Sequence, residues 1–191
     1  MVNRQFQKSH WGTVKDWWMG LGNPWKTLFL ENLEMEYDDP MANIHRVFSL
    51  EELDLSRSEI RDLSPLKYFG NLRYLDLSMT DIDDLTPLED LVNLQELHFT
   101  GSKNLDVSQL SRIPNLEVLD LSYPETPPVN FDELYKLDQL KAFYGNGCSL
   151  NSIAEFVALD QLEVLCLYFN IIPAKELRAF KELYPDCKVM C

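Results

Sequence analysis

The stretch NLRYLDLSMTDIDDLTPLEDLVNLQELHF, residues 71–99, decides the fold because it contains one apolar pattern twice. The pattern L-x-x-L-x-L falls at Leu72, Leu75 and Leu77, and it returns 22 residues later at Leu94, Leu97 and Phe99. Residues at alternate positions of such a segment share one face of a β-strand. Between the copies, apolar residues recur at every third position, which suits a short 3₁₀ helix. The stretch therefore predicts a short strand followed by a helical return.

The same unit recurs along most of the chain. Copies of the pattern start near residues 25, 50, 72, 94, 116, 140 and 162. The copy at Leu140 is weak, since Phe143 and Gly145 follow it, and the first copy is divergent, with Trp25, Leu28 and Leu30. No single unit can bury its own apolar edge, so neighbouring units have to stack on one another. We predict an α/β protein built from stacked repeats.

Two motifs in the returns make the pattern more specific. They are DLSPL at residues 62–66 and DLTPL at residues 84–88, in which Ser or Thr before Pro predicts a helix N-cap followed by Pro at the first helical position. With the 22-residue spacing, these motifs resemble the leucine-rich repeat family, in particular the short repeats of internalins and of a phosphatase-1 regulatory subunit, and indicate a bacterial member. The resemblance implies a right-handed solenoid with a parallel sheet on its concave face and 3₁₀ or short-helix returns on its convex face. It implies protein binding without naming the partner.

Both ends of the solenoid need caps, because terminal repeats would otherwise expose apolar surface. Residues 1–24 contain Phe6, Trp11, Trp17 and Trp18, which predict an aromatic N-terminal cap or, alternatively, an exposed Trp patch for a partner. After repeats over residues 25–172, residues 173–191 form a predicted C-terminal helical cap and tail. Pro173 opens this helix, and its apolar side consists of Leu177, Phe180 and Leu183.

Composition and charge exclude several classes of function. The chain has 191 residues, with 17 Lys and Arg against 31 Asp and Glu, which gives a net charge of −14. An acidic protein repels phosphate groups, so we expect neither nucleic acid nor an anionic membrane as a partner. No apolar run approaches the ~20 residues that span a bilayer, and residues 1–22 lack the continuous apolar core of a signal peptide. We therefore expect a cytoplasmic protein, and a monomer.

The cysteines and histidines do not predict a cofactor or metal site. An even number of cysteines, at 148, 166, 187 and 191, permits two disulfides, but a chain of this length can build a core without them, which favours free thiols. The three histidines are scattered, whereas zinc sites need ligands at short spacings. We expect no cofactor and no metal.

The predicted strands present acidic residues in the early repeats and aromatic residues in the later ones. The predicted partner-binding residues are the acids Glu52, Asp54, Asp76, Glu96 and Asp120 and the aromatics Tyr74, Tyr123, Tyr144, Tyr168 and Phe169. Asp54 and Asp76 face each other on adjacent strands ~4.8 Å apart, an unfavourable pair without a cation or a basic partner. Clustered aromatic side chains beside acids are typical of protein-binding surfaces. A merely solvated acidic sheet remains the alternative for the carboxylates.

Catalysis is not expected, and three binding functions remain. His98 and Cys166 share a column of the predicted sheet but lie three strands apart, roughly 14 Å, whereas a Cys–His dyad needs a separation of about 3 Å. The first hypothesis is a non-enzymatic module that binds a partner protein, possibly basic, on its concave face. The second is an inhibitor or immunity-type protein that neutralises a basic enzyme or toxin. The third is a secreted or surface adhesion protein, by analogy with internalins.

Overall fold

The computed structural model describes residues 11–32, 44–103 and 105–191, and the chain divides into two compact units, Met1–Ser49 and Leu50–Cys191. The described part of the first unit consists of helices α1 (Trp11–Gly20), α2 (Asn23–Asn32) and α3 (Ile44–Phe48). Aromatic rings pack together in this unit: the centroids of Trp17 and Phe48 lie 4.9 Å apart, and those of Trp25 and Phe29 lie 5.4 Å apart. Because Trp18 and Trp25 are buried, these rings form a core and not an exposed patch. Phe6 lies outside the described residues.

Helix α2 corrects the prediction of a repeat strand beginning at residue 25. Trp25 and Phe29 are both buried, and their separation of four residues places them on one helix face. Asn23 followed by Pro24 suits a helix start, since Pro tolerates the first turn. Helical spacing therefore overrides the partial L-x-x-L-x-L match, and the first repeat strand belongs to the copy at Leu50.

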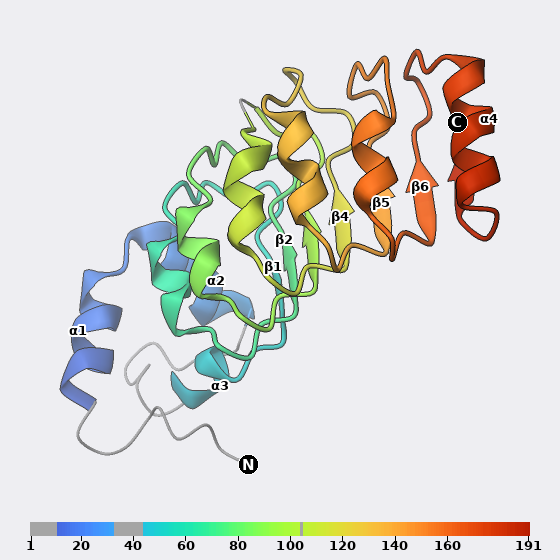
Figure 1. The fold of residues 1–191 in the computed structure, drawn as a ribbon. Coiled ribbons are helices and arrows are strands. Elements are labelled where there is room, and N and C mark those ends of the chain that lie inside the picture. The colour runs from blue at the N-terminus through green and yellow to red at the C-terminus, as the bar shows by residue number, and fades with distance from the viewer. Residues whose placement is uncertain (1–10, 33–43, 104) are drawn as a thin grey trace. The chain divides into compact units, whose positions relative to one another are not determined.

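The second unit is a seven-stranded parallel sheet whose strands follow one another in chain order (Figure 1). The strands are β1 (Glu52–Asp54), β2 (Tyr74–Asp76), β3 (Glu96–His98), β4 (Val118–Asp120), β5 (Ala142–Tyr144), β6 (Val164–Cys166) and β7 (Lys188–Met190). Returns between the strands contain the 3₁₀ helices η3 (Ser64–Tyr68), η4 (Thr86–Asp90), η5 (Val107–Arg112), η6 (Phe131–Lys136) and η7 (Ala154–Ala158). These helices line up in a row along the side of the unit away from the strands.

The strand register confirms the predicted repeat alignment from residue 50 onward. Leu53 pairs with Leu75, Leu75 with Leu97, and Leu97 with Leu119, and all four side chains are buried. The residues on either side of these leucines alternate to the opposite face of the sheet, as the period of two requires. Stacked leucines therefore form the core, and one polar face of the sheet is left for function.

The returns begin differently from the prediction. We expected Ser64 and Thr86 to cap the 3₁₀ helices, but the acceptor is the aspartate two residues earlier in the chain. Asp62 Oδ1 accepts the Ser64 backbone N–H at 2.8 Å, and Asp84 Oδ1 accepts that of Thr86 at 2.9 Å. The hydroxyl of Ser64 donates to Asp62 as well, so it supports the aspartate instead of capping the backbone.

The C-terminal segment combines the predicted helix with a strand that the sequence did not reveal. Helix α4 (Ala174–Leu183) begins after Pro173 and buries Phe180. Leu183, predicted on the apolar side, is 63% exposed. The tail then forms β7, which adds to the sheet parallel to β6. Among the described residues, no helix is both long and apolar enough to cross a membrane.

The weak repeat at Leu140 is explained by one oversized side chain. Phe143 is fully buried, and its ring occupies the space of the missing leucine: a Cβ atom on Gly145 would lie 2.4 Å from Phe143 Cε1. A contact this short cannot form without movement of the ring. The pair Phe143 and Gly145 therefore replaces the usual two leucines with one large and one minimal residue.

This exchange predicts strong coupling between the two positions. Gly145→Leu should lower the free energy of unfolding by about 1–3 kcal/mol through overpacking, and Phe143→Leu by a comparable amount through a cavity. The double substitution should recover most of the loss, because it restores the ordinary repeat. Urea unfolding of the four proteins measures the coupling, and additive losses would contradict this account.

Candidate partner-binding surface

The predicted site residues lie in two columns across the strands and in the turns that follow them. The first column contains Glu52, Tyr74 and Glu96, and the middle column contains Asp54, Asp76, His98, Asp120, Tyr144 and Cys166. Tyr168 lies in a third column just beyond the strands, with Ser56, Ser78, Thr100, Ser122 and Asn146, and Tyr123 and Phe169 come one residue later in their repeats. We call the exposed side of these three columns, together with Tyr123 and Phe169, the sheet surface.

The aspartates of the middle column each hold the backbone of their own turn. Asp54, Asp76 and Asp120 accept, through Oδ1, the N–H of the serine two residues ahead at 2.8, 2.7 and 2.8 Å. These N–H groups lie just beyond the parallel ladder, so they need another acceptor. The repeated Asp-Leu-Ser is therefore an Asx turn, and it was the signal in the sequence for this structural role.

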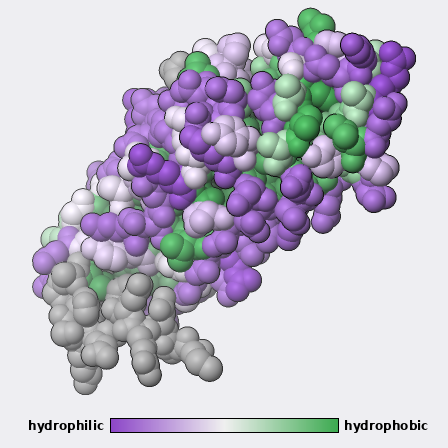
Figure 2. Space-filling view, in the orientation of Figure 1, coloured by the Kyte–Doolittle hydropathy of each residue, from purple (hydrophilic) through white to green (hydrophobic). Residues whose placement is uncertain are grey.

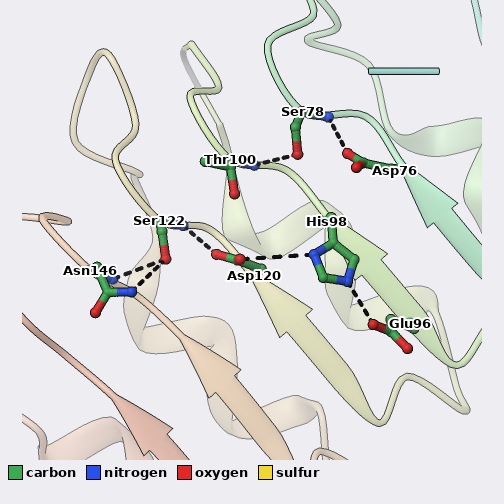
Figure 3. A network of polar contacts seen from close by, with 8 residues as sticks. All are labelled: Asp76, Ser78, Glu96, His98, Thr100, Asp120, Ser122 and Asn146. Atoms are coloured by element: carbon green, nitrogen blue, oxygen red, sulfur yellow. Dashed lines mark hydrogen bonds and ion pairs between the residues drawn. The ribbon is translucent and has the colours of Figure 1, made fainter. Parts of the chain in front are cut away.

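Where the middle column has no aspartate, the preceding repeat supplies the acceptor. Ser78 Oγ accepts the N–H of Thr100 at 3.2 Å, and Ser122 Oγ accepts that of Asn146 at 3.2 Å (Figure 3). Asn146 Oδ1 then accepts the N–H of Tyr168 at 2.9 Å. All six equivalent N–H groups therefore have an acceptor. The side chains of His98, Tyr144 and Cys166 do not have to accept a hydrogen bond from the turn that follows them.

His98 forms the charged centre of the sheet surface, and sequence reasoning missed it. Its Nε2 lies 2.7 Å from Glu96 Oε1, and its Nδ1 lies 3.8 Å from Asp120 Oδ2 (Figure 3). Asp120 raises the pKa of His98, burial opposes this effect, and Glu96 adds to it, giving a pKa of about 9. The imidazole is therefore cationic at neutral pH and neutralises much of the charge of the two acids.

The negative charge concentrates at β1 and β2. Within the described part of the chain, Glu52, Asp54 and Asp76 have no cationic partner. Burial and then the surrounding carboxylates raise the pKa of the Tyr74 phenol, which lies between them. Each of the facing aspartates is held by its own turn.

The later repeats expose aromatic side chains. Tyr123, Tyr168 and Phe169 are 52%, 45% and 80% exposed. The rings of Tyr123 and Phe169 approach to 6.1 Å although their repeats are not adjacent, whereas Tyr144 is half-buried in the middle column. The sheet surface therefore changes from acidic to aromatic along the sheet.

The structure does not bring the one candidate catalytic pair together. His98 and Cys166 occupy the middle column three strands apart. Cys166 is buried, and its thiol donates to Asn146 Oδ1 at 3.2 Å. Burial raises the pKa of Cys148 to about 12, which keeps that thiol protonated. No group of three or more metal-ligating side chains occurs among the residues that the structure describes.

Comparison with known proteins identifies solved structures with the same fold. No protein-family model and no curated protein matches the sequence. Among solved structures, an internalin from Listeria monocytogenes is similar with a TM-score of 0.60 and 23% identity, over 81% of this chain and 44% of the internalin. A leucine-rich repeat protein from Leptospira interrogans is similar with a TM-score of 0.62 and 26% identity, over 78% of this chain and 39% of that protein.

The chain has the leucine-rich repeat fold. Internalin C2 from Listeria monocytogenes is also similar, with a TM-score of 0.52 and 25% identity, over 65% of this chain and 64% of internalin C2. The chain thus spans less than two thirds of each of these three structures. These three proteins are bacterial, as the sequence indicated, and the fold they share is that of a family of protein-interaction modules.

The Asx turns predict that the structural role of Asp76 can be separated from the effect of its charge. Asp76→Ala should lower the free energy of unfolding by about 1 kcal/mol, because the N–H of Ser78 loses its acceptor. Asp76→Asn retains an Oδ1 acceptor and should change stability little. The exposed Asp83→Ala serves as the control for loss of one surface charge. Equal losses for Asp76→Ala and Asp76→Asn, measured in urea, would assign the effect to charge.

His98 predicts a pH-dependent contribution to stability. Its pKa is about 9 in the folded protein against 6.5 for a free imidazole, so protonation favours the folded state. The contribution should be complete below about pH 6.5 and should vanish as the pH rises through about 9. NMR titration of the imidazole should give a midpoint near 9, and Asp120→Asn should lower it. A midpoint near 6.5 in the unmodified protein would refute the ion pairs.

Proposed function

We propose that the protein is a non-enzymatic protein–protein interaction module that binds a partner protein on its sheet surface, the concave face of this fold. One observation carries the proposal: the sheet surface presents acids without a cationic partner at β1 and β2 and exposed aromatic residues in the turns after β4 and β6. Tyr123, Tyr168 and Phe169 are exposed there, although a leucine-rich repeat core does not need them. Exposed aromatic clusters are characteristic of binding surfaces because they lose water readily and provide hot-spot contacts.

The rest of the surface supports this location. The view of Figure 2, which looks onto the 3₁₀ helices, is mainly hydrophilic with smaller hydrophobic areas over the C-terminal repeats. Ion pairs also link neighbouring repeats away from the sheet surface, for example Arg61 with Asp81 at 2.9 Å and Arg112 with Glu89 at 2.5 Å. Such paired charges are a less favourable site for a partner than the unpaired acids of β1 and β2.

The charge distribution favours a second, sharper candidate: an inhibitor or immunity-type protein that neutralises a basic enzyme or toxin. The chain carries a net charge of −14, and Glu52, Asp54 and Asp76 present part of it on the sheet surface. An acidic surface accelerates the capture of a basic partner, and this effect weakens as salt screens the charges.

Affinity capture from a lysate of the source cells tests both candidates. The wild-type protein is compared with Asp54→Asn/Asp76→Asn/Asp120→Asn, which keeps an amide acceptor for each Asx turn, and with Tyr144→Ala/Tyr168→Ala. We expect a partner that the wild type retains and the tyrosine variant loses. For the inhibitor, the partner should be basic, and both the triple variant and high salt should weaken its retention.

Other results would refute these proposals. Retention of the same partner by all variants would move the binding site away from the sheet surface. Retention of a basic partner that does not depend on salt would refute the inhibitor. Tyr135→Ala provides the control, since Tyr135 is an exposed tyrosine of η6 outside the sheet surface.

A further inference from the structure

One position in every repeat has a left-handed backbone. The residue two places after the last core position of each strand has a φ between 53° and 70°. These six residues are Arg57, Met79, Gly101, Tyr123, Gly147 and Phe169. In the first five, the backbone N–H donates to the carbonyl of the third column in the next repeat, at distances of 2.7–3.0 Å. The turn is therefore fixed by the stacking of the repeats, whatever side chain it carries.

Glycine is the residue best suited to this backbone, yet three of the positions hold large apolar side chains. A left-handed conformation brings Cβ close to the backbone, a penalty that glycine alone avoids. Met79, Tyr123 and Phe169 accept this penalty while 55%, 52% and 80% exposed. Neither burial nor backbone conformation accounts for them, so their presence points to a role outside the fold.

The two glycines of the column leave room for the side chains beside them. Met79 Cγ lies 3.3 Å from where a Cβ on Gly101 would be, and Tyr123 Cδ1 lies 3.1 Å from the equivalent point on Gly147. Tyr123 can therefore lean across Gly147 and reach the ring of Phe169, with 6.1 Å between the centroids. We call Met79, Tyr123 and Phe169, with the glycines beneath them, the apolar ridge.

Beside the apolar ridge, the charge of the sheet surface changes from strand to strand. Glu52, Asp54 and Asp76 are acidic at β1 and β2, and Arg57 at the head of the column offsets only part of their charge. At β3 and β4, the cationic His98 offsets one of the two negative charges of Glu96 and Asp120. A ligand that crosses the strands would thus meet the carboxylates of β1 and β2, which we call the acidic zone, then a less negative zone, and then the paired rings of Tyr123 and Phe169.

We propose that the apolar ridge and the acidic zone together bind an extended segment of the partner that carries basic residues at one end and a large apolar anchor at the other. The basic residues contact Asp54 and Asp76, and the anchor packs on Tyr123 and Phe169. This inference rests on the proposed protein-binding function and specifies the partner's chemistry. Charge complementarity selects a basic segment, and the exposed rings select the anchor.

The strand spacing sets the length of the segment. From β2 to the paired rings above the turn of β5 there are three strand intervals of ~4.8 Å, about 14 Å in total. An extended chain advances about 3.4 Å per residue, so about four residues separate the basic group from the anchor. The probe is therefore the synthetic peptide Lys-Lys-Gly-Ser-Gly-Ser-Leu-Trp, labelled for fluorescence anisotropy.

Three matched peptides test each part of the probe. One lacks the four-residue spacer, one has serines in place of the lysines, and one has serines in place of Leu-Trp. We expect each to bind the wild-type protein about tenfold more weakly than the probe. Added salt should weaken binding of the probe but leave binding of the lysine-free peptide unaffected. Equal affinity of all four peptides, or no measurable binding of the probe, would overturn the inference.

Glycine substitutions remove side chains of the apolar ridge without destabilising the fold. Tyr123→Gly and Phe169→Gly place the preferred residue in a left-handed turn, so both proteins should remain folded. Each glycine substitution should weaken binding of the probe about tenfold without altering the salt dependence of that binding. Asp54→Asn/Asp76→Asn should weaken binding and also reduce its salt dependence. Tyr135→Ala should bind the probe like the wild type. Unchanged binding by the glycine variants would refute the ridge as the anchor site.

The result can be distinguished from failure of the proposed function. If a captured partner is lost by Tyr144→Ala/Tyr168→Ala but retained by Phe169→Gly, the sheet surface binds protein and the ridge inference is wrong. If light scattering shows a dimer that Phe169→Gly dissociates, the ridge binds a second copy of this chain, and the inference is again wrong. If no variant affects a captured partner while the peptide data hold, the proposed function at the sheet surface fails by itself.

Discussion

Each of the strands β1–β6 is followed by a backbone N–H that the parallel ladder leaves without an acceptor. The surface chemistry of this protein follows from which side chain accepts that N–H. Where the repeat has Asp-Leu-Ser, the aspartate accepts it and is tied to its own turn. Where the aspartate is absent, Ser78, Ser122 or Asn146 of the preceding repeat accepts it. Only the second arrangement leaves the middle position available for another side chain.

The two kinds of acceptor change which residues are candidates for binding a partner. From the sequence, the aspartates were predicted to bind, because carboxylates in a column suggest a binding site. Their Oδ1 atoms are engaged, however, so their contribution to binding is charge and the remaining oxygen. His98 occupies a position whose side chain does not have to accept from the turn, and between Glu96 and Asp120 it offsets one of their two negative charges. An acidic zone and an aromatic zone result, separated by this imidazolium.

The fold from residue 50 onward could be predicted because Leu53, Leu75 and their equivalents form a column that admits one register. The strand predicted at Trp25 was wrong because three apolar matches fit a helix as well as a strand. Strand β7 was missed because the residues around it lack the L-x-x-L-x-L pattern of the other strands. The ion pairs of His98 with Glu96 and Asp120 could not be predicted, since both depend on side-chain rotamers that the sequence does not specify. The left-handed turns left no signal except Gly101 and Gly147.

The alternation of acceptors also sets how firmly successive repeats are coupled during unfolding. A bond from an aspartate to its own turn adds nothing between repeats, whereas the bond from Ser78 joins β2 to β3 and the bonds from Ser122 and Asn146 join β4 to β5 and β5 to β6. In a linear array of repeats, stability is a sum over units and their junctions. The block β4–β6, with two consecutive bonds of this kind, should therefore open as one cooperative unit, with slower amide hydrogen exchange than β1. The aromatic end of the sheet would then be its most rigid part.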